Sequence, residues 1–315
     1  PLAHQYIPMF LRNFFENPSA TEAKNEPAAR KISCEKFPIE VSGGTAEVYD
    51  YQPSPEIQKS TVPLMLAPGC GGDEALYHES IVHLVENFGR RVITLDHPKQ
   101  REREHEIWEE APTKGLEIKA HNILDVIKTK GLQRTDAVAH SEGALNLITA
   151  AAHAPERFRN IILVAPAGFI GKDSLGNLAL RFAKNFFAGQ PETISSLPKT
   201  DQERAHASLS SKVRRVLNCV YGNLFRVLSE IEGIAKSDIH DQLKKLKEAG
   251  IHIVIVAPVE DEVFPIERIQ KMVQAGDIDG FFVIRGGHGD IARISRFVDI
   301  VGSAIETLEE KEVSI

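Results

Sequence analysis

The sequence predicts an α/β protein in which a mostly parallel sheet is covered by helices on both faces. Short, nearly all-apolar runs such as Val62 to Ala67 are typical of strands buried on both sides. Segments with helical periodicity separate these runs, and strands that alternate with helices form parallel sheets. The alternation stops between residues 171 and 238, where only helical patterns occur. We therefore predict a core domain at 31–170 and 239–315, an inserted helical cap at 171–238 and an N-terminal arm at 1–30.

Composition and charge restrict the class of protein. The 315 residues are 42% hydrophobic and 26% charged, and the formal net charge is -7. This is the composition of a globular chain, and the acidic balance argues against a nucleic-acid-binding surface. No apolar run is long enough to span a membrane, and the first residues lack the pattern of a secretory signal. We expect a small-molecule substrate and neither a metal nor a cofactor, and a homodimer is compatible with the sequence.

The cysteines bear on the cellular compartment. Cys34, Cys70 and Cys219 are odd in number and far apart, which fits reduced thiols better than a disulfide framework. A cytoplasmic protein is therefore expected.

The first half of the chain supplies most of the sheet. Ser42, Gly43 and Gly44 lie between two strand-like runs, which is the signal of a hairpin. The expected strands are 32–41, 45–51, 62–67, 91–95, a short strand that ends before Ser141, and 160–165. The expected helices are 74–86, 116–130, which Gly131 ends, and a helix that begins after Ser141.

The second half contains the cap and the rest of the core. Helical patterns at 175–187, 202–209 and 213–234 form the expected cap. Their apolar residues suit the roof of a pocket, although packing within the cap explains most of them equally well. The alternation then resumes, with helices expected at 240–249, 266–275 and 291–310 and strands at 251–257 and 280–285.

A serine lies at the junction of a strand and a helix. In Ala139-His140-Ser141-Glu142-Gly143, small residues stand two positions before and two positions after the serine. Bulk at these positions would collide with the neighbouring strand and helix in a tight strand-to-helix turn. Such a turn lifts the Ser141 hydroxyl clear of the sheet. It also leaves the first N–H groups of the helix available for developing negative charge.

Three further motifs follow predicted strands, namely Pro68-Gly-Cys-Gly-Gly72, Glu260-Asp-Glu-Val-Phe-Pro265 and Gly287-His-Gly289. With the serine turn, they occur in the order nucleophile, acid, histidine, which resembles the lid-bearing branch of the α/β-hydrolase family over about residues 32–310. The resemblance implies the α/β-hydrolase fold, with a mostly parallel sheet of the eight-stranded type. Pro68 stands where the family usually has histidine. The family calls the turn that carries the serine, here residues 139–143, the nucleophile elbow, and Ala139 replaces its usual first glycine.

The resemblance also assigns roles to residues. Ser141 is the expected nucleophile, His288 the base that later acts as acid, and Asp261 the carboxylate that orients His288. Glu260 and Glu262 are the rivals of Asp261, which is favoured by its spacing to the proline and its shorter side chain. Asp290, near His288, is expected to cap the last helix instead.

Backbone donors and pocket residues complete the predicted site. The oxyanion hole is expected to use the N–H groups of Glu142 and, carried over from the family, of Cys70. The Cys70 thiol has no role in this scheme. The residues expected to line the substrate pocket are Gly69, Gly71, His97, His140 and Phe169.

These expectations together predict a serine hydrolase that cleaves a small to medium, partly apolar carboxylic ester through an acyl-enzyme. Thioester, lactone or amide hydrolysis, cleavage of a carbon–carbon bond in a diketone, and cofactor-free perhydrolysis remain alternatives within the same machinery. Haloalkane and epoxide hydrolysis are disfavoured because those branches carry aspartate where Ser141 stands. A receptor or binding module that keeps the triad but turns over slowly is the alternative from another class.

Overall fold

The computed structural model describes most of the chain after residue 30. The described ranges are 31–98, 114–169, 173–187, 228–273, 278–292 and 295–313. These residues belong to one compact unit, Lys31–Ile315. The predicted arm at 1–30, the predicted helix at 202–209 and most of the one at 213–234 lie outside the described residues. The division into a core domain and a cap stays a prediction.

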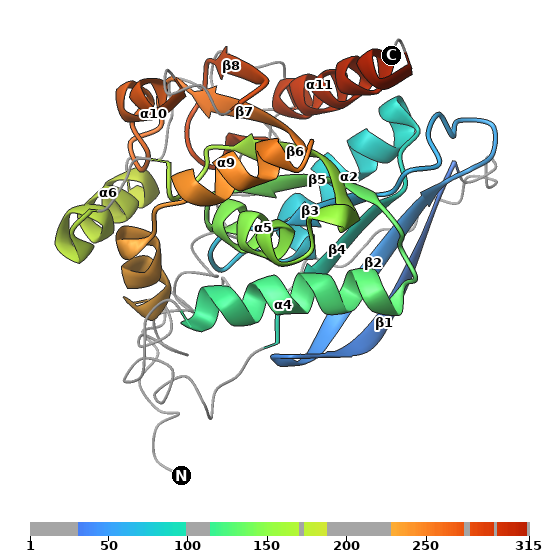
Figure 1. Ribbon diagram of the computed structural model, residues 1–315, viewed down its shortest axis with the longest axis horizontal. Helices are drawn as coiled ribbons and strands as arrows, with labels where there is room; N and C mark the ends of the chain where they lie inside the picture. Colours follow the sequence, from blue (N-terminus) through green and yellow to red (C-terminus); the bar gives the residue numbers. More distant parts are fainter. Residues whose placement is uncertain are drawn as a thin grey trace, which may run out of the picture. The chain divides into compact units, whose positions relative to one another are not determined.

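An eight-stranded sheet forms the centre of the unit (Figure 1). Its order is β1-β2-β4-β3-β5-β6-β7-β8, with antiparallel pairing between β1 and β2 and between β2 and β4, and parallel pairing elsewhere. The strands are β1 (Ile32–Val41), β2 (Gly44–Pro53), β3 (Leu64–Ala67), β4 (Val92–Asp96), β5 (Thr135–His140), β6 (Phe158–Val164), β7 (His252–Pro258) and β8 (Gly280–Ile284). The predicted hairpin and the mostly parallel sheet are thus confirmed.

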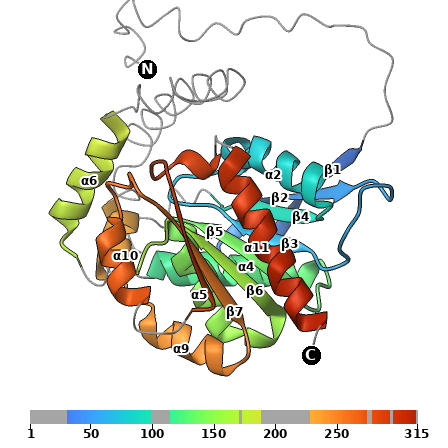
Figure 2. The same ribbon diagram turned by 90° about the horizontal axis from the view of Figure 1, so that it is seen from above.

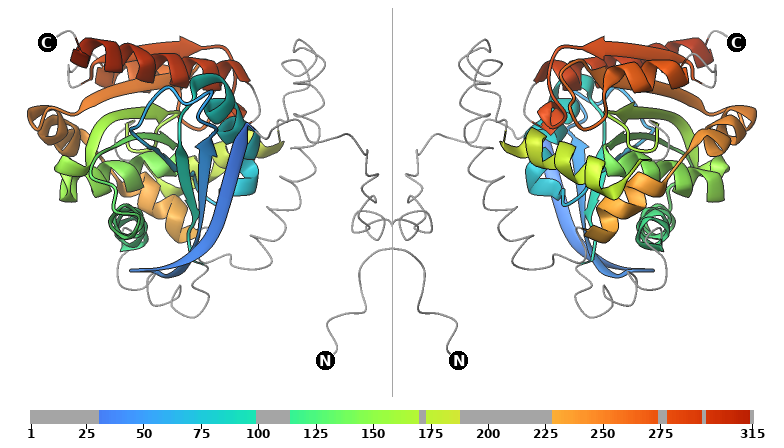
Figure 3. Two further views of the ribbon diagram at one scale, coloured as in Figure 1. Left: turned by 90° about the vertical axis from the view of Figure 1, so that its right-hand side faces the viewer. Right: turned by 90° about the vertical axis from the view of Figure 1, so that its left-hand side faces the viewer.

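Burial follows the position of each strand in the sheet. Every residue of β3 and β5 is buried, as expected for central parallel strands covered on both faces. The hairpin of β1 and β2 forms one edge, and β8 forms the other, where the side chains of Phe282 and Val283 are exposed. Figure 3 shows these edges from two sides, with the hairpin in blue and β8 in orange-red.

Helices cover both faces of the sheet (Figures 1 and 2). Residues of α4, α5, α9 and α10 share one buried apolar cluster with the sheet, and residues of α2 and α11 share a second. The helices are α2 (Glu74–Phe88), α4 (Lys114–Thr129), α5 (Glu142–His153), α6 (Leu175–Phe187), α9 (His240–Glu248), α10 (Ile266–Val273) and α11 (Ser295–Val313), with 3₁₀ turns η1 (Pro155–Arg157) and η2 (Asp290–Ala292). Residues 228–236 are also helical. Within the described part of the chain, no helix is long and apolar enough to cross a membrane.

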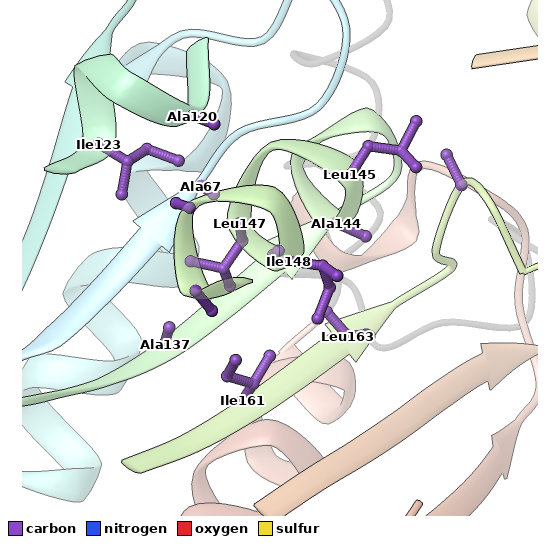
Figure 4. Close-up of a cluster of buried hydrophobic side chains, with 14 of the residues drawn as sticks. Ala67, Ala120, Ile123, Ala137, Ala144, Leu145, Leu147, Ile148, Ile161 and Leu163 are labelled. Atoms are coloured by element: carbon purple, nitrogen blue, oxygen red, sulfur yellow. The ribbon is translucent and has the colours of Figure 1, made fainter. Parts of the chain in front are cut away.

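Helix α5 is packed tightly onto the sheet because small residues allow a close approach. Figure 4 shows Leu147 and Ile148 of this helix directed onto the strands that carry Ala137 and Ile161. The four side chains are fully buried. Burial of one such leucine or isoleucine contributes about 1.5–3 kcal/mol. This packing fixes the start of α5, which immediately follows Ser141.

The opposite end of β5 is anchored by charge. Asp136 is fully buried, and its carboxylate accepts hydrogen bonds from Arg159 and from the side-chain amide of Asn160. Arg90 also pairs with Asp136, and both arginines bind Glu309 of α11. The strand that leads to Ser141 is therefore held at both ends.

The predicted elements that fall within the described residues are confirmed to within a few residues, with one difference near the C-terminus. In the range of the expected helix at 291–310, the structure has the 3₁₀ turn η2 (Asp290–Ala292) and the helix α11 (Ser295–Val313). The carboxylate of Asp290 accepts the Gly287 N–H at 2.7 Å. Asp290 thus binds the turn that contains His288, and its predicted role as a helix N-cap stays a prediction.

Candidate active site

The turn between β5 and α5 holds Ser141 in a conformation that L-residues rarely adopt. Its φ is 54° and its ψ is -122°. A non-glycine residue held in such a region costs on the order of 1–3 kcal/mol. A Cβ added to Gly143 would lie 2.3 Å from the Ala67 carbonyl oxygen and 2.6 Å from that of Pro68. These two carbonyl oxygens are the reason why the position two residues after the serine requires a small residue.

Ser141, His288 and Asp261 come together from three strand ends. His288 Nε2 lies 2.9 Å from Ser141 Oγ, and His288 Nδ1 lies 2.8 Å from Asp261 Oδ2. A carboxylate only accepts hydrogen bonds, so Nδ1 carries a proton and Nε2 can accept one from the serine hydroxyl. The three residues are only 3%, 6% and 4% exposed. The arrangement can therefore remove the hydroxyl proton of Ser141.

Residues 260–265, which we call the acid turn, hold the Asp261 side chain through backbone N–H groups. Asp261 Oδ1 accepts the N–H groups of Val263 at 2.8 Å and Phe264 at 2.9 Å, so its other oxygen is directed to His288. The rival Glu260 instead pairs with Arg285. Of these two carboxylates, the geometry therefore brings Asp261 to the histidine.

Aromatic rings flank His288. The ring of Phe264 lies edge-on with its centroid 5.2 Å from that of His288, and the ring of Phe182 lies at 6.1 Å. Phe182 belongs to α6 in the range of the predicted cap, whose apolar residues suit a pocket roof. The proximity of Phe264 to the histidine was not anticipated from the sequence, which offered no signal beyond its place in the acid turn.

A chain of hydrogen bonds links three segments. They are the glycine-rich loop (residues 68–72), the nucleophile elbow and the histidine loop (residues 287–289). The Tyr77 hydroxyl accepts the Gly69 N–H at 3.0 Å and donates to His140 Nδ1 at 2.7 Å. His140 Nε2 donates to the carbonyl oxygen of His288 at 2.7 Å. Both nitrogens of His140 thus hold backbone or side chains in place. Its predicted place in a substrate pocket stays a prediction.

The glycine-rich loop lies directly against the nucleophile. A Cβ added to Gly69 would be 3.1 Å from Ser141 Cβ. The loop turns tightly, with the Gly72 N–H bound to the Gly69 carbonyl at 2.8 Å and a φ of 63° at Gly71. Glycine at position 69 allows the backbone to approach Ser141 closely, which is what the predicted oxyanion loop requires.

Comparison with known proteins matches this geometry to a family. The family model of the alpha/beta hydrolase fold matches residues 62–220, which is just over half of the 315-residue chain. The chain belongs to the α/β-hydrolase fold family. Membership indicates a hydrolase, and it agrees with the resemblance carried by the four motifs.

Solved structures of this α/β-hydrolase fold span several reactions. A thermophilic esterase from Thermogutta terrifontis is 17% identical, with 87% of this chain and 99% of that chain covered and a TM-score of 0.59. An enol-lactonase from Burkholderia xenovorans is 16% identical, with 87% and 100% covered and a TM-score of 0.59. A bromoperoxidase from Bacillus anthracis is 15% identical, with 88% and 100% covered and a TM-score of 0.59. At these identities the likeness concerns the fold and leaves the reaction open.

A buried charged network lies next to Ser141 in this α/β-hydrolase. Lys119 Nζ of α4 lies 2.7 and 2.9 Å from the two carboxylate oxygens of Glu142 and 2.7 Å from Glu230 Oε1. The Cys70 thiol donates to Glu230 Oε2 at 2.9 Å. We call these four residues, Cys70, Lys119, Glu142 and Glu230, the elbow network. Burial raises the pKa of the Cys70 thiol well above its usual value, and the charges of Glu230 and Glu142 raise it further. A thiol held protonated is a poor nucleophile, in line with the expectation that the Cys70 thiol is not used.

Lys119 and Glu230 were not anticipated from the sequence. The one available signal was Glu142 itself, a carboxylate next to the nucleophile at the start of an otherwise apolar helix. Its cationic partner lies 23 residues earlier in sequence and the second carboxylate 111 residues from that lysine. A pairing over such separations leaves no local pattern.

Two predicted pocket residues have other contacts. Phe169 is buried in the apolar core, with its ring centroid 6.0 Å from that of His240. His97 Nδ1 lies 3.3 Å from the side-chain nitrogen of Asn122 on α4. The part that Phe169 and His97 play in a pocket stays a prediction, as it does for Gly69 and Gly71.

Two groups among the described residues have the composition and spacing of metal ligands. One is exposed on α4 and α5 and consists of Glu117, His121 and His153. The other consists of Cys70, Glu142 and Glu230. In the second group the Lys119 ammonium already lies between the two carboxylates, at the place where a cation would bind.

Proposed function

We propose that this protein is a serine hydrolase that cleaves a small to medium, partly apolar carboxylic ester through an acyl-enzyme. The observation that carries the proposal is the line of contacts from Ser141 Oγ to His288 Nε2 and from His288 Nδ1 to Asp261 Oδ2, at 2.9 and 2.8 Å. These distances lie within the hydrogen-bond reach that proton transfer between a nucleophile and its base requires.

The proposed reaction follows from the positions of the three side chains. Ser141 Oγ attacks the ester carbonyl while His288 Nε2 takes the hydroxyl proton, and Asp261 stabilises the imidazolium that forms. The N–H groups of Glu142 and Cys70 stabilise the oxyanion, and His288 then protonates the leaving alcohol. Water then attacks the acyl carbonyl while His288 takes its proton. His288 returns this proton to Ser141 Oγ as the carboxylic acid leaves. The rings of Phe182 and Phe264 beside His288 favour a substrate with an apolar part.

The test combines covalent labelling with turnover. The purified protein is treated with a fluorophosphonate probe and assayed with 4-nitrophenyl butyrate. We expect labelling and hydrolysis, both abolished in Ser141→Ala. Asp261→Asn should lower kcat by about 10³–10⁴-fold, because the histidine loses its orienting partner and its correct tautomer. A folded wild-type protein that takes no probe and shows no turnover would sink the proposal and favour a binding module.

The same nucleophile could act on other carbonyl compounds. A relative by fold is named an enol-lactonase and another a bromoperoxidase, so lactone hydrolysis and cofactor-free perhydrolysis are the natural comparisons. A panel of matched ester, thioester, lactone and diketone substrates ranks them by kcat/KM. A labelled protein that cleaves only the diketone would move the assignment to carbon–carbon bond hydrolysis.

A further inference from the structure

Glu142 places a carboxylate directly after the proposed nucleophile Ser141. Glu142 is the first residue of α5, and its N–H is one of the two donors proposed for the oxyanion. The positive end of a helix favours a developing negative charge, whereas a carboxylate on the same residue opposes it. Glu142 is fully buried, so neither water nor salt screens its charge. An uncompensated Glu142 would therefore raise the barrier to the reaction that the elbow is built to perform.

Lys119 compensates this charge at close range. Its ammonium contacts both oxygens of Glu142, at 2.7 and 2.9 Å, and one oxygen of Glu230 at 2.7 Å. The side chains of Lys119, Glu142 and Glu230 are only 11%, 1% and 9% exposed. Buried charges are tolerated when they are paired and hydrogen-bonded, and the removal of one member of such a set is costly.

The elbow network also contacts the second proposed oxyanion donor. Glu230, from the helical residues 228–236, accepts a hydrogen bond from the Cys70 thiol at 2.9 Å. Cys70 is the residue whose backbone N–H is the other proposed donor. One lysine on α4 thus connects, through two carboxylates, the two residues that would stabilise the oxyanion.

We propose that Lys119 is a positioning residue of the oxyanion hole, which pairs with both Glu142 and Glu230, offsets one of their two negative charges and holds both residues that carry the donors. Lys119 itself does not touch the reacting atoms in this scheme. The inference rests on the proposed serine-hydrolase function and deepens it. It assigns to a buried ion network the task of lowering the negative charge around the oxyanion.

The first experiment removes the lysine charge. Lys119→Met and the matched control Lys128→Met, on the exposed side of the same helix, are compared with wild type using 4-nitrophenyl butyrate. We expect Lys119→Met to lower kcat by about 10²-fold, the scale of a lost oxyanion donor, with KM within about threefold. Lys128→Met should leave both constants unchanged. Lys119→Arg, which keeps the charge, should recover most of kcat.

The pH profile separates a charge effect from a packing effect. The titratable groups that face Glu142 among the described residues are Lys119 of α4, Glu230 of the 228–236 helix and Cys70 of the glycine-rich loop. Without the lysine, a buried carboxylate has a raised pKa and becomes neutral as the pH falls. The ratio of kcat for Lys119→Met to kcat for wild type should therefore rise toward low pH. A pure packing defect would leave that ratio constant.

A neutral network provides the decisive comparison. The triple variant Lys119→Met, Glu142→Gln, Glu230→Gln removes all three charges and should restore kcat to within about fivefold of wild type, because apolar or neutral replacements of a buried ion set are often tolerated. A triple variant as slow as Lys119→Met would overturn the proposal. So would a Lys119→Met protein with wild-type kcat at every pH.

Folding is checked by far-ultraviolet circular dichroism and thermal unfolding. If Lys119→Met does not fold, the variant Glu142→Gln, Glu230→Gln replaces it. It should be at least as fast as the triple variant, since it leaves only a cation near the oxyanion, and a tenfold lower kcat would refute the idea. A wild-type protein without labelling or turnover would overturn the proposed function and this inference together, whereas an active wild type with an unaffected Lys119→Met overturns the inference alone.

Discussion

Replacement of Tyr77 by phenylalanine removes one hydroxyl and keeps the aromatic ring. The hydroxyl accepts from the Gly69 N–H at 3.0 Å and donates to His140 Nδ1 at 2.7 Å, and all three residues meet behind the nucleophile. The variant therefore removes one link between the glycine-rich loop and the histidine loop and changes little in the packing of α2. The effect should appear both in stability and in kcat.

The magnitude follows from the two groups that lose this partner. A buried donor or acceptor without its hydrogen bond costs about 1–3 kcal/mol, so two such groups give roughly 2–6 kcal/mol of lost unfolding free energy. Tyr77 is only 2% exposed, which makes replacement of the hydroxyl by water difficult. The Gly69 backbone lies against Ser141, so its displacement should also lower kcat.

Urea unfolding measured by circular dichroism tests the stability effect, and ester turnover tests the effect on kcat. Tyr49→Phe on β2 is the matched control, because its hydroxyl binds Asp96 at 3.2 Å in a part-buried position. We expect less than about 1 kcal/mol for this control. The reasoning is refuted if Tyr77→Phe unfolds within about 0.5 kcal/mol of wild type with an unchanged denaturant slope.

Two further predictions concern the elbow and the acid dependence of stability. Gly143→Ala should destabilise by about 1–3 kcal/mol and lower kcat, because its Cβ would overlap the Ala67 carbonyl, whereas Gly115→Ala, with no atom within 4 Å of the added Cβ, should be neutral or stabilising in urea unfolding. Burial alone would raise the pKa of Asp173, but hydrogen bonds led by that from Arg181 lower it to about 2. Asp173→Asn should therefore lower the free energy of unfolding by about 2 kcal/mol at pH 7, and this difference from wild type should shrink as the pH falls from 4 to 2. Unfolding curves measured at several pH values test this. A difference that stays constant with pH would contradict it.

The elbow, the acid turn and the histidine loop were predictable because each has a local requirement. Gly143 is demanded by two carbonyl oxygens in van der Waals overlap range, and Asp261 is held by the N–H groups of its own turn. Strand ends of a parallel sheet meet at one edge, so the order of the strands places these local motifs together. The fold class followed from the same alternation of buried strands and helices.

The parts that escaped prediction depend on partners far apart in sequence. Neither Tyr77 of α2 nor Lys119 of α4 was singled out from the sequence. Only the folded arrangement shows that the first bonds Gly69 and His140 and the second binds two carboxylates.

The place of β8 at the edge of the sheet has a consequence for how the protein acquires its activity. His288 follows this outermost strand, whereas Ser141 follows β5 near the centre, 147 residues earlier. Contacts between residues so distant in sequence form slowly during folding, because the intervening chain must first be ordered. Refolding followed by circular dichroism should therefore reach its plateau before the proposed hydrolytic activity returns. The return of activity would then indicate that β8 has paired with the sheet. Transient separation of β8 would displace His288 and stop the proposed reaction while most of the sheet remained folded.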